Sequence, residues 1–380
     1  MKVLTVIDGF ALGGAERLLA TLAAFGPKAG FELEMVGVRA PESHGTMEGV
    51  PAEAQLTASS LHAGRFGDPI AVKRLAEVIR KSDCEVVHAH LERASTIAWL
   101  AGTIVDRPTV CTFHHPAREI PGRVSAAKED LAVFGAARTK GLIFPSRDTW
   151  DSFEQRYHKR PTWALLYNGI DLSEFSTEPA EMPADLGIPA GVPVAAFVAA
   201  FHRRKGHEEA LRAWPGVLEQ VPEARLLLVG AGVEEANVRA TIDELGIGDS
   251  VLMAGLRSDV PQIMRASTLV LLPSRSEAVP TVLIEAAACG RAIVATRAGG
   301  NWEALEDERS GLLVELDDVP GLTSALAALL GDPQRAAEMG RAGRALAEER
   351  FDAGVWVDRL NAIYEGALAG VPAGETLAAA

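Results

Sequence analysis

The chain has 380 residues and a formal net charge of −14, and 48% of its residues are hydrophobic and 23% charged. This length is too great for one ordinary domain and comfortable for two. The composition excludes a disordered chain, and the negative charge argues against nucleic acid as a partner. No apolar run reaches the roughly 20 residues that cross a bilayer. We therefore expect a globular protein of two domains.

The amino terminus and the cysteines indicate the compartment. The apolar part of MKVLTVIDGF is too short for a signal peptide and predicts a first strand. Cys84, Cys111 and Cys289 lie in or beside apolar segments, and their spacing suggests no pairing. We expect reduced thiols in the core of a cytoplasmic protein.

The charge is unevenly distributed. Residues 1–175 hold 20 Lys and Arg against 21 Asp and Glu, whereas residues 176–380 hold 17 against 30. The more neutral amino-terminal half is the less repulsive one toward an anionic surface. It permits peripheral contact with the inner face of a membrane.

Apolar runs alternate with amphipathic stretches through the first half, which predicts parallel strands joined by helices. Strands are expected at residues 2–7 and 31–38, with further strands beginning near residues 84, 108, 141 and 161. A helix is expected at residues 68–81. Residues 39–68 are loop-like in composition and predict a variable loop region.

The first strand runs into a loop with Gly9, Gly13 and Gly14 at the start of an amphipathic helix. Such a loop can bring backbone N–H groups close to a phosphate. Neither the dinucleotide fingerprint G-x-G-x-x-G nor a phosphate-loop Gly-Lys-Ser/Thr is present. A phosphate contact and a simple tight turn therefore both remain open.

Histidines gather where two strands are expected to end. His88 and His90 fall in one expected loop, and His114 and His115 in the next. A metal site is one interpretation. Paired histidines without nearby carboxylates are more typical of hydrogen-bonded structural groups, so we expect no metal.

A Pro- and Glu-rich stretch at residues 177–193 predicts a linker. Residues 194–201 then predict a strand, and HRRKG predicts a basic loop before the next helix. Lys and Arg in such a loop are well placed to bind a diphosphate. Lys205 and Arg204 are the candidates, because an extended loop would turn Arg203 away.

The most specific stretch is Pro273–Trp302, which follows an apolar strand. It predicts a loop, a helix at residues 281–288, a strand at 292–296, and a further helix opened by RAGGN. Glu277 falls in the loop, and Glu285 on a helix of almost entirely apolar residues. Because a buried unpaired carboxylate is costly, Glu285 is expected to face a polar cleft. Loops at the carboxyl ends of parallel strands are where ligands bind.

These two carboxylates form an E-x7-E pattern, followed by EAAACGRAIVAT and AGGNWE, while GGAE follows the first strand and YNGID precedes the linker. In these motifs the chain resembles family 4 of the retaining glycosyltransferases, from Val3 to about Tyr364. The resemblance implies the α/β GT-B fold, in which two Rossmann-like domains with parallel sheets face a central cleft. The implied domains are residues 1–175, with a helix at about 353–370 packed back on them, and residues 190–352. The last ten residues are expected to fray.

The resemblance also implies roles for particular residues. The implied catalytic residues are Glu277, His114 and Lys205, with His115 as a neighbour or rival of His114. The implied donor-binding residues are Gly13, Gly14, Arg204, Lys205, Arg257, Glu277, Ala278, Val279, Glu285, Gly299, Gly300 and Asn301. One family position differs: Ala200 stands where an Arg is normal, and Arg203 and Arg204 are the cations that could replace it.

The sequence therefore predicts an enzyme that transfers a sugar with retention from a nucleotide-diphosphate sugar to a hydroxyl acceptor. The acceptor would be a glycan, a lipid-linked molecule or a small molecule in polysaccharide or glycoconjugate biosynthesis. Electrostatic stabilisation of the departing diphosphate by the protein would replace a metal cofactor. Two alternatives stay open: a sugar-nucleotide epimerase, and a catalytically impaired homologue that acts as a binding partner, which Ala200 keeps in play.

Overall fold

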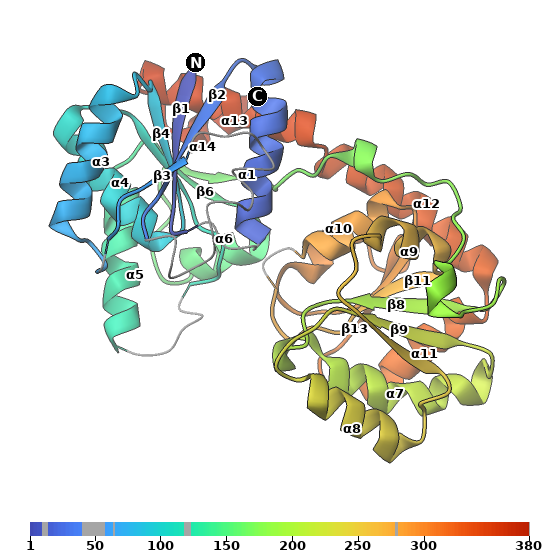
Figure 1. The fold of residues 1–380 in the computed structure, drawn as a ribbon. Coiled ribbons are helices and arrows are strands. Elements are labelled where there is room, and N and C mark those ends of the chain that lie inside the picture. Colours follow the sequence, from blue (N-terminus) through green and yellow to red (C-terminus); the bar gives the residue numbers. More distant parts are fainter. Residues whose placement is uncertain (10–13, 40–57, 64, 118–122, 278–279, 380) are drawn as a thin grey trace. The chain divides into compact units, whose positions relative to one another are not determined.

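The computed structural model describes residues 1–9, 14–39, 58–63, 65–117, 123–277 and 280–379. The chain divides into two compact units (Figure 1). Unit 1 comprises Met1–Ile170 with Asp352–Ala380, and unit 2 comprises Asp171–Phe351. None of the helices in the described ranges combines the length and apolar character needed to traverse a bilayer.

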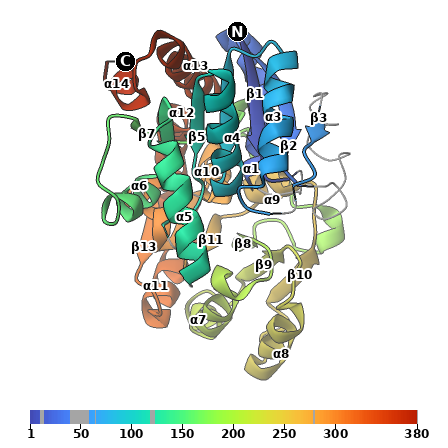
Figure 2. The ribbon, with the colours of Figure 1, turned by 90° about the vertical axis from the view of Figure 1, so that its left-hand side faces the viewer.

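Unit 1 is a parallel sheet with helices on both faces (Figures 1 and 2). In its described part, seven strands follow the order β3-β2-β1-β4-β5-β6-β7. The strands are β1 (Lys2–Ile7), β2 (Glu32–Gly37), β3 (Ala58–Ser60), β4 (Val86–His90), β5 (Thr109–Thr112), β6 (Gly141–Phe144) and β7 (Trp163–Leu165). The helices are α1 (Gly14–Phe25), α3 (Pro69–Lys81), α4 (Glu92–Val105), α5 (Arg123–Ala136), α6 (Arg147–Glu154), α13 (Ala353–Ala369) and α14 (Ala373–Ala379).

The apolar core of unit 1 lies on both faces of this sheet. Along β1, Leu4 and Val6 pack toward α3, α4, α5 and α6, whereas Val3 and Ile7 pack toward α1, α13 and α14. Alternate side chains of a strand point to opposite faces. A strand that is covered on both faces therefore reads as a continuous apolar run, as the sequence predicted.

The carboxyl-terminal residues differ from expectation. The prediction of a frayed tail is wrong, because residues 373–379 form α14. The backbone N–H groups of Ala373 and Gly374 donate to the carbonyls of Lys140 and Pro161, each at 3.0 Å. Ala373 is buried with the core face of α13. Hydrogen bonds and apolar burial together hold this short helix against β6 and β7.

Unit 2 is a second parallel sheet, with the order β10-β9-β8-β11-β12-β13 among the described residues. Helices α9, α10 and α12 lie on one face and α7, α8 and α11 on the other (Figure 1). The strands are β8 (Val194–Val198), β9 (Arg225–Val229), β10 (Val251–Gly255), β11 (Leu269–Leu272), β12 (Ala292–Thr296) and β13 (Gly311–Val314). The helices are α7 (His207–Gln220), α8 (Glu235–Leu245), α9 (Val260–Ala266), α10 (Thr281–Ala288), α11 (Val319–Leu330) and α12 (Pro333–Arg350).

The stretch that composition marks as a linker packs against this second sheet. Met182, Leu186 and Ile188 contact the apolar cluster formed by β8, β9 and α9. Ala184–Leu186 form a single turn of 3-10 helix, and the segment belongs to unit 2. Apolar contacts thus hold the segment on the sheet, together with a hydrogen bond from the side chain of Gln262 to the carbonyl of Glu181 at 3.0 Å.

The three cysteines confirm the expectation of core thiols. Cys84, Cys111 and Cys289 are buried and unpaired. Burial raises the pKa of Cys111 to about 12 and that of Cys289 to about 11. Both groups therefore stay in the poorly reactive thiol form at neutral pH.

Candidate active site

In unit 2 the site begins at the point where the strand order reverses. β8 and β11 are neighbours in the sheet, yet β9 and β10 follow β8 on one side while β12 and β13 follow β11 on the other. The loops that leave these two central strands diverge and open a crevice at their carboxyl ends, which is where ligands bind in open α/β sheets. Lys205 follows β8, and Glu277 follows β11.

Lys205 and Glu277 meet at this edge although 72 residues separate them. The ammonium group of Lys205 donates to Oε1 of Glu277 at 2.5 Å. Their side chains are only 17% and 10% exposed. A short charge-assisted bond that is largely shielded from water is stronger than a surface ion pair. The structure thus brings together two of the three residues expected to be catalytic.

Two glycines allow the loops to approach this closely. At Gly206 φ is +80°, and a Cβ atom there would lie 1.9 Å from the carbonyl oxygen of Pro273. At Gly299 φ is +50°, and a Cβ atom would lie 2.0 Å from the carbonyl oxygen of Glu277. Gly300 then donates its N–H to that same oxygen at 2.9 Å. Any larger residue at either glycine would push the loop that carries Glu277 away.

The segment opened by RAGGN differs from the expected helix. Gly299–Glu303 form a five-residue 3-10 helix, not an α-helix. Asn301 is fully buried, and its Nδ2 donates to the carbonyl of Thr296 at 3.0 Å and lies 3.3 Å from Oγ of Ser274. Nδ2 of Asn301 therefore joins the ends of β11 and β12.

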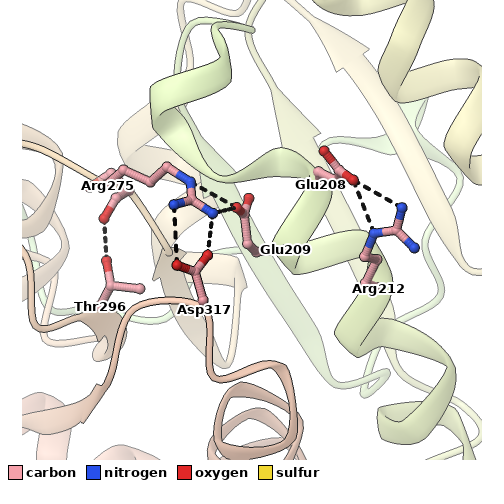
Figure 3. A network of polar contacts seen from close by, with 7 residues as sticks. Glu208, Glu209, Arg212, Arg275, Thr296 and Asp317 are labelled. Atoms are coloured by element: carbon pink, nitrogen blue, oxygen red, sulfur yellow. Dashed lines mark hydrogen bonds and ion pairs between the residues drawn. The ribbon is translucent and has the colours of Figure 1, made fainter.

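A network around Arg275 fastens the same loop to its neighbours. Figure 3 shows the guanidinium group of Arg275 between the carboxylates of Glu209 on α7 and Asp317 after β13. Its Nε lies 3.0 Å from Oε1 of Glu209. The backbone N–H of Arg275 donates to the carbonyl of Arg204 at 2.7 Å. Arg275 thus ties the loop after β11 to the loop after β8, beside the Lys205–Glu277 pair.

The basic loop after β8 differs from an extended strand of alternating side chains. Arg203–Lys205 form one turn of 3-10 helix, capped by the His202 ring, which accepts from the N–H of Arg204. The alternation argument that turned Arg203 away is therefore wrong. Arg203 and Arg204 are both exposed, as is Ala200.

Two further predicted donor-binding residues lie elsewhere in unit 2. Glu285 on α10 is half-buried and has interaction partners within the protein. Arg257 follows β10 at the sheet edge, where its Nε donates to Asp259 at 2.9 Å and a second branch pairs with Asp185. The hydrogen bonds that Arg257 donates to these two carboxylates raise its pKa. Its charge is already matched by two carboxylates.

In unit 1, His114 lies just beyond β5 and is 8% exposed. Its Nε2 lies 3.0 Å from Nδ1 of His90, which is on β4. The expectation of a loop at residues 88–90 is wrong, because His88 and His90 belong to β4, which α13 contacts. Burial, and to a smaller degree the neighbouring histidines, hold the pKa of His90 and of His114 well below 6.5.

Of the remaining predicted residues, one lies in the described part of the chain and three lie outside it. Gly14 is the first residue of α1, whereas Gly13, Ala278 and Val279 lie outside the described residues. Among the described residues no group of three or more His, Cys, Asp or Glu side chains has the arrangement of a metal site. Hydrogen bonds join His88 to Tyr364 and His90 to His114.

Sequence reasoning missed two features of the site. Arg275 was not singled out, and the only signal was its place between a strand end and Glu277. Asn301 was expected to face a ligand, but its amide is used inside the protein. Both contacts join loops that lie far apart in the chain.

Comparisons with known proteins agree with this geometry. The family model described as "Glycosyltransferase Family 4" matches residues 12–174, and the model "Glycosyl transferases group 1" matches residues 179–346. N-acetyl-alpha-D-glucosaminyl L-malate synthase of Bacillus anthracis is 26% identical over 78% of this chain and 78% of its own length. A GDP-mannose-dependent monoacylated alpha-(1-6)-phosphatidylinositol monomannoside mannosyltransferase of Corynebacterium glutamicum is 28% identical, over 78% of this chain and 80% of its own length.

A solved structure has the same arrangement of elements. The Anabaena protein HepE, solved in complex with UDP, aligns over the full length of both chains with a TM-score of 0.82 and 23% identity. This likeness confirms the expected fold of two α/β domains with parallel sheets.

Proposed function

Because the chain belongs to family 4 of the glycosyltransferases and has the GT-B fold, we propose that it transfers a sugar, with retention, from a nucleotide-diphosphate sugar to a hydroxyl acceptor. The observation that carries the proposal is the Lys205–Glu277 pair at the strand-order reversal of unit 2. A cation for the diphosphate and a carboxylate for the sugar stand side by side there.

The proposed chemistry follows from these two charges. In the net reaction, the bond between the anomeric carbon and the diphosphate oxygen breaks, a bond from that carbon to the acceptor oxygen forms, and the acceptor's proton is released with the nucleoside diphosphate. Negative charge grows on the departing diphosphate. Lys205 stabilises that charge, assisted by Arg204 on the same turn. Glu277 accepts hydrogen bonds from the sugar hydroxyls near the reacting carbon and orients them. Lys205 and Arg204 supply the positive charge that a divalent metal ion supplies in other enzymes, so the transfer needs no metal ion.

The other proposed contacts surround this centre. Glu285 holds the ribose hydroxyls, and the backbone of Gly299–Asn301 approaches the phosphates. In unit 1, His114 hydrogen-bonds to the donor sugar. The relatives support a nucleotide-sugar donor, since one is named as GDP-mannose-dependent and HepE was solved with UDP. The acceptor hydroxyl belongs to a glycan, a lipid-linked molecule or a small molecule. A lipid-linked acceptor would be bound at the inner face of a membrane.

The test is a donor screen with the full chain. UDP-, GDP- and ADP-sugars are supplied with a panel of hydroxyl acceptors in the presence of EDTA, and release of the nucleoside diphosphate is measured. Nuclear magnetic resonance then assigns the anomeric configuration of the product. We expect release with one donor class and an unchanged configuration. Inversion, or activity lost with EDTA and restored by manganese or magnesium, would refute the corresponding part of the proposal.

The screen also separates the alternatives. An epimerase would convert the donor sugar without an acceptor. A catalytically impaired homologue would bind a nucleoside diphosphate in calorimetry and release none from any donor.

A further inference from the structure

A line of polar side chains crosses one face of the unit 1 sheet that is otherwise apolar. On β4, Val86, His88 and His90 alternate and so share the face that α1 and α13 cover. The register of the parallel pair sets Thr112 of β5 beside His90. Toward the amino ends of these strands the face is apolar, and toward their carboxyl ends it becomes polar.

Hydrogen bonds and ring contacts join this line from α13 to the strand ends. The hydroxyl of Tyr364 on α13 lies 2.7 Å from Nδ1 of His88, and Oγ1 of Thr112 lies 2.8 Å from its Nε2. The rings of His88 and His90 have centroids 4.2 Å apart. Nδ1 of His90 lies 3.0 Å from Nε2 of His114. Each of these side chains is buried.

The contact between His90 and His114 has a direction. Because burial keeps both pKa values low, both rings are neutral near pH 7. A neutral imidazole carries a single N–H. Either His90 donates from Nδ1, or His114 donates from Nε2, and the choice fixes which outer nitrogen of the pair carries a proton.

The far nitrogen of His90 decides between the two arrangements. Its Nε2 is buried and has no hydrogen-bond partner among the described residues. If His114 were the donor, this nitrogen would carry a buried N–H with no acceptor. Buried N–H groups without an acceptor are rarer in proteins than buried acceptors without a donor. The arrangement in which His90 donates leaves only an unpaired acceptor.

We propose that His90 is a positioning residue, which donates its Nδ1–H to Nε2 of His114 and thereby holds His114 in the tautomer that carries its proton on Nδ1. Within the described part of the chain Nδ1 of His114 makes no hydrogen bond. It is therefore left to donate to a hydroxyl oxygen of the donor sugar, a step that rests on the proposed function. His88, anchored by Tyr364 and Thr112, supports the ring of His90 by stacking.

The direct test reads the tautomer and needs no activity. The full chain is labelled with 15N-histidine, and two-bond proton–nitrogen correlations distinguish protonated from unprotonated ring nitrogens. The loss of one set of signals in His114→Gln assigns that residue. We expect His114 to carry its proton on Nδ1 and, in His90→Leu, to shift toward a mixture of tautomers. A proton on Nε2 of His114 in the wild type, or no change in His90→Leu, would overturn the proposal.

The kinetic test uses a conservative rescue. The side-chain amide of Asn places an N–H close to the position of the imidazole Nδ1. We expect His90→Leu to lower kcat about 10- to 100-fold with little change in acceptor KM, since a misplaced contact group acts on turnover. His90→Asn should recover most of that loss. Equal loss in both variants would mean that only packing matters and would overturn the proposal.

The tests remain decisive if His90→Leu does not fold or if the proposed function is wrong. If His90→Leu fails to fold, as judged by its thermal unfolding, His90→Asn still decides, because it must keep the proton of His114 on Nδ1. If the wild type transfers no sugar from any donor, the proposed function fails, while the tautomer measurement still stands or falls by itself.

Discussion

The first six strands of each sheet follow the same order, but the carboxyl ends of the two sheets differ in their chemistry. In unit 1 this edge carries neutral histidines, His90 and His114, buried against helices and joined ring to ring. In unit 2 it carries formal charges: Lys205 forms an ion pair with Glu277, and Arg275 lies between two carboxylates. The same scaffold therefore presents uncharged hydrogen-bonding groups in one unit and a cluster of ion pairs in the other.

The cause lies in where the residues stand. His90 is within β4, inside the face covered by α1 and α13, where a charged form would lose its hydration. Lys205 and Glu277 stand on loops beyond their strands, brought together by the positive-φ glycines. Buried neutral groups are indifferent to salt but sensitive to acid, whereas ion pairs respond to salt. The predictions that follow use this difference.

The largest effect is expected at Glu277. Glu277→Gln removes the charge that meets Lys205 and the sugar, so turnover should fall about 100- to 1,000-fold. Affinity for the nucleoside diphosphate should change little. Glu285→Gln should show the reverse, losing about 10- to 100-fold in nucleotide affinity, as expected when a charge-assisted hydrogen bond is lost.

Initial rates and calorimetric titration of the nucleoside diphosphate measure both variants. Glu208→Gln is the matched control, since Glu208 lies on α7 and pairs with Arg212 at the surface. Equal losses of affinity in Glu277→Gln and Glu285→Gln would contradict the division of roles.

The next prediction concerns acid and unit 1. Burial lowers the pKa of His88 to about 3 and those of His90 and His114 well below 6.5. The unfolded chain, with ordinary histidines, binds protons below about pH 6.5 that the folded chain does not bind. The contribution of these histidines to the free energy of unfolding is therefore fully present above about pH 6.5. It is lost as the pH falls toward their pKa values in the folded chain. Each histidine contributes up to about 1.4 kcal/mol per pH unit.

Urea unfolding at about pH 7.5, 6.5 and 5.5 measures this loss, before most carboxylates titrate. Burial also lowers the pKa of His207 in unit 2, to about 4, so His90→Asn removes one of four such sites and should lessen the slope by about a quarter. A free energy of unfolding that is flat between pH 6.5 and 5.5 would show that these histidines accept protons without unfolding.

A smaller effect is expected from the arginines of the basic turn. Arg204→Ala should raise the donor KM and lower kcat together, at a cost of about 2 kcal/mol in transition-state stabilisation. Arg203→Ala is the matched variant on the same turn and should cost less, because Arg203 lines a cavity with Glu208, Glu209 and Glu234 on the side of α7 and α8. Steady-state kinetics compares them. If both are dispensable in an active enzyme, Lys205 alone holds the diphosphate from this loop.

The smallest effect tests the network drawn in Figure 3. Arg275→Ala unties the loop that carries Glu277, and we expect about a fivefold loss of kcat/KM, or ~1 kcal/mol. Arg212→Ala removes a comparable surface ion pair on α7 and should leave activity unchanged. High salt should weaken wild-type activity toward that of Arg275→Ala, since exposed pairs are screened. Identical kinetics for the two variants would show that the loop is held by its glycines and Asn301.

Much of the local structure was determined by the sequence alone. The strands β1 and β12 and the helix α10 begin and end where their apolar runs and flanking Pro and Gly residues predicted. Loop positions after strands likewise placed Lys205 and Glu277 at a ligand-binding edge. These features depend on short-range periodicity and on backbone preferences, which a single sequence displays directly.

Contacts between distant segments were decided only by the tertiary structure. The Lys205–Glu277 bond joins residues 72 apart, and His88 finds Tyr364 at a separation of 276 residues. Nothing in local periodicity records which strands are neighbours or how they are registered. Contacts between distant segments turned the amide of Asn301 inward and placed His90 against His114. They also packed α14 on β6 and β7. Several pairings of distant segments are compatible with the local sequence patterns. The tertiary structure decides between them, because burial and hydrogen bonding act between segments only after the sheet has formed.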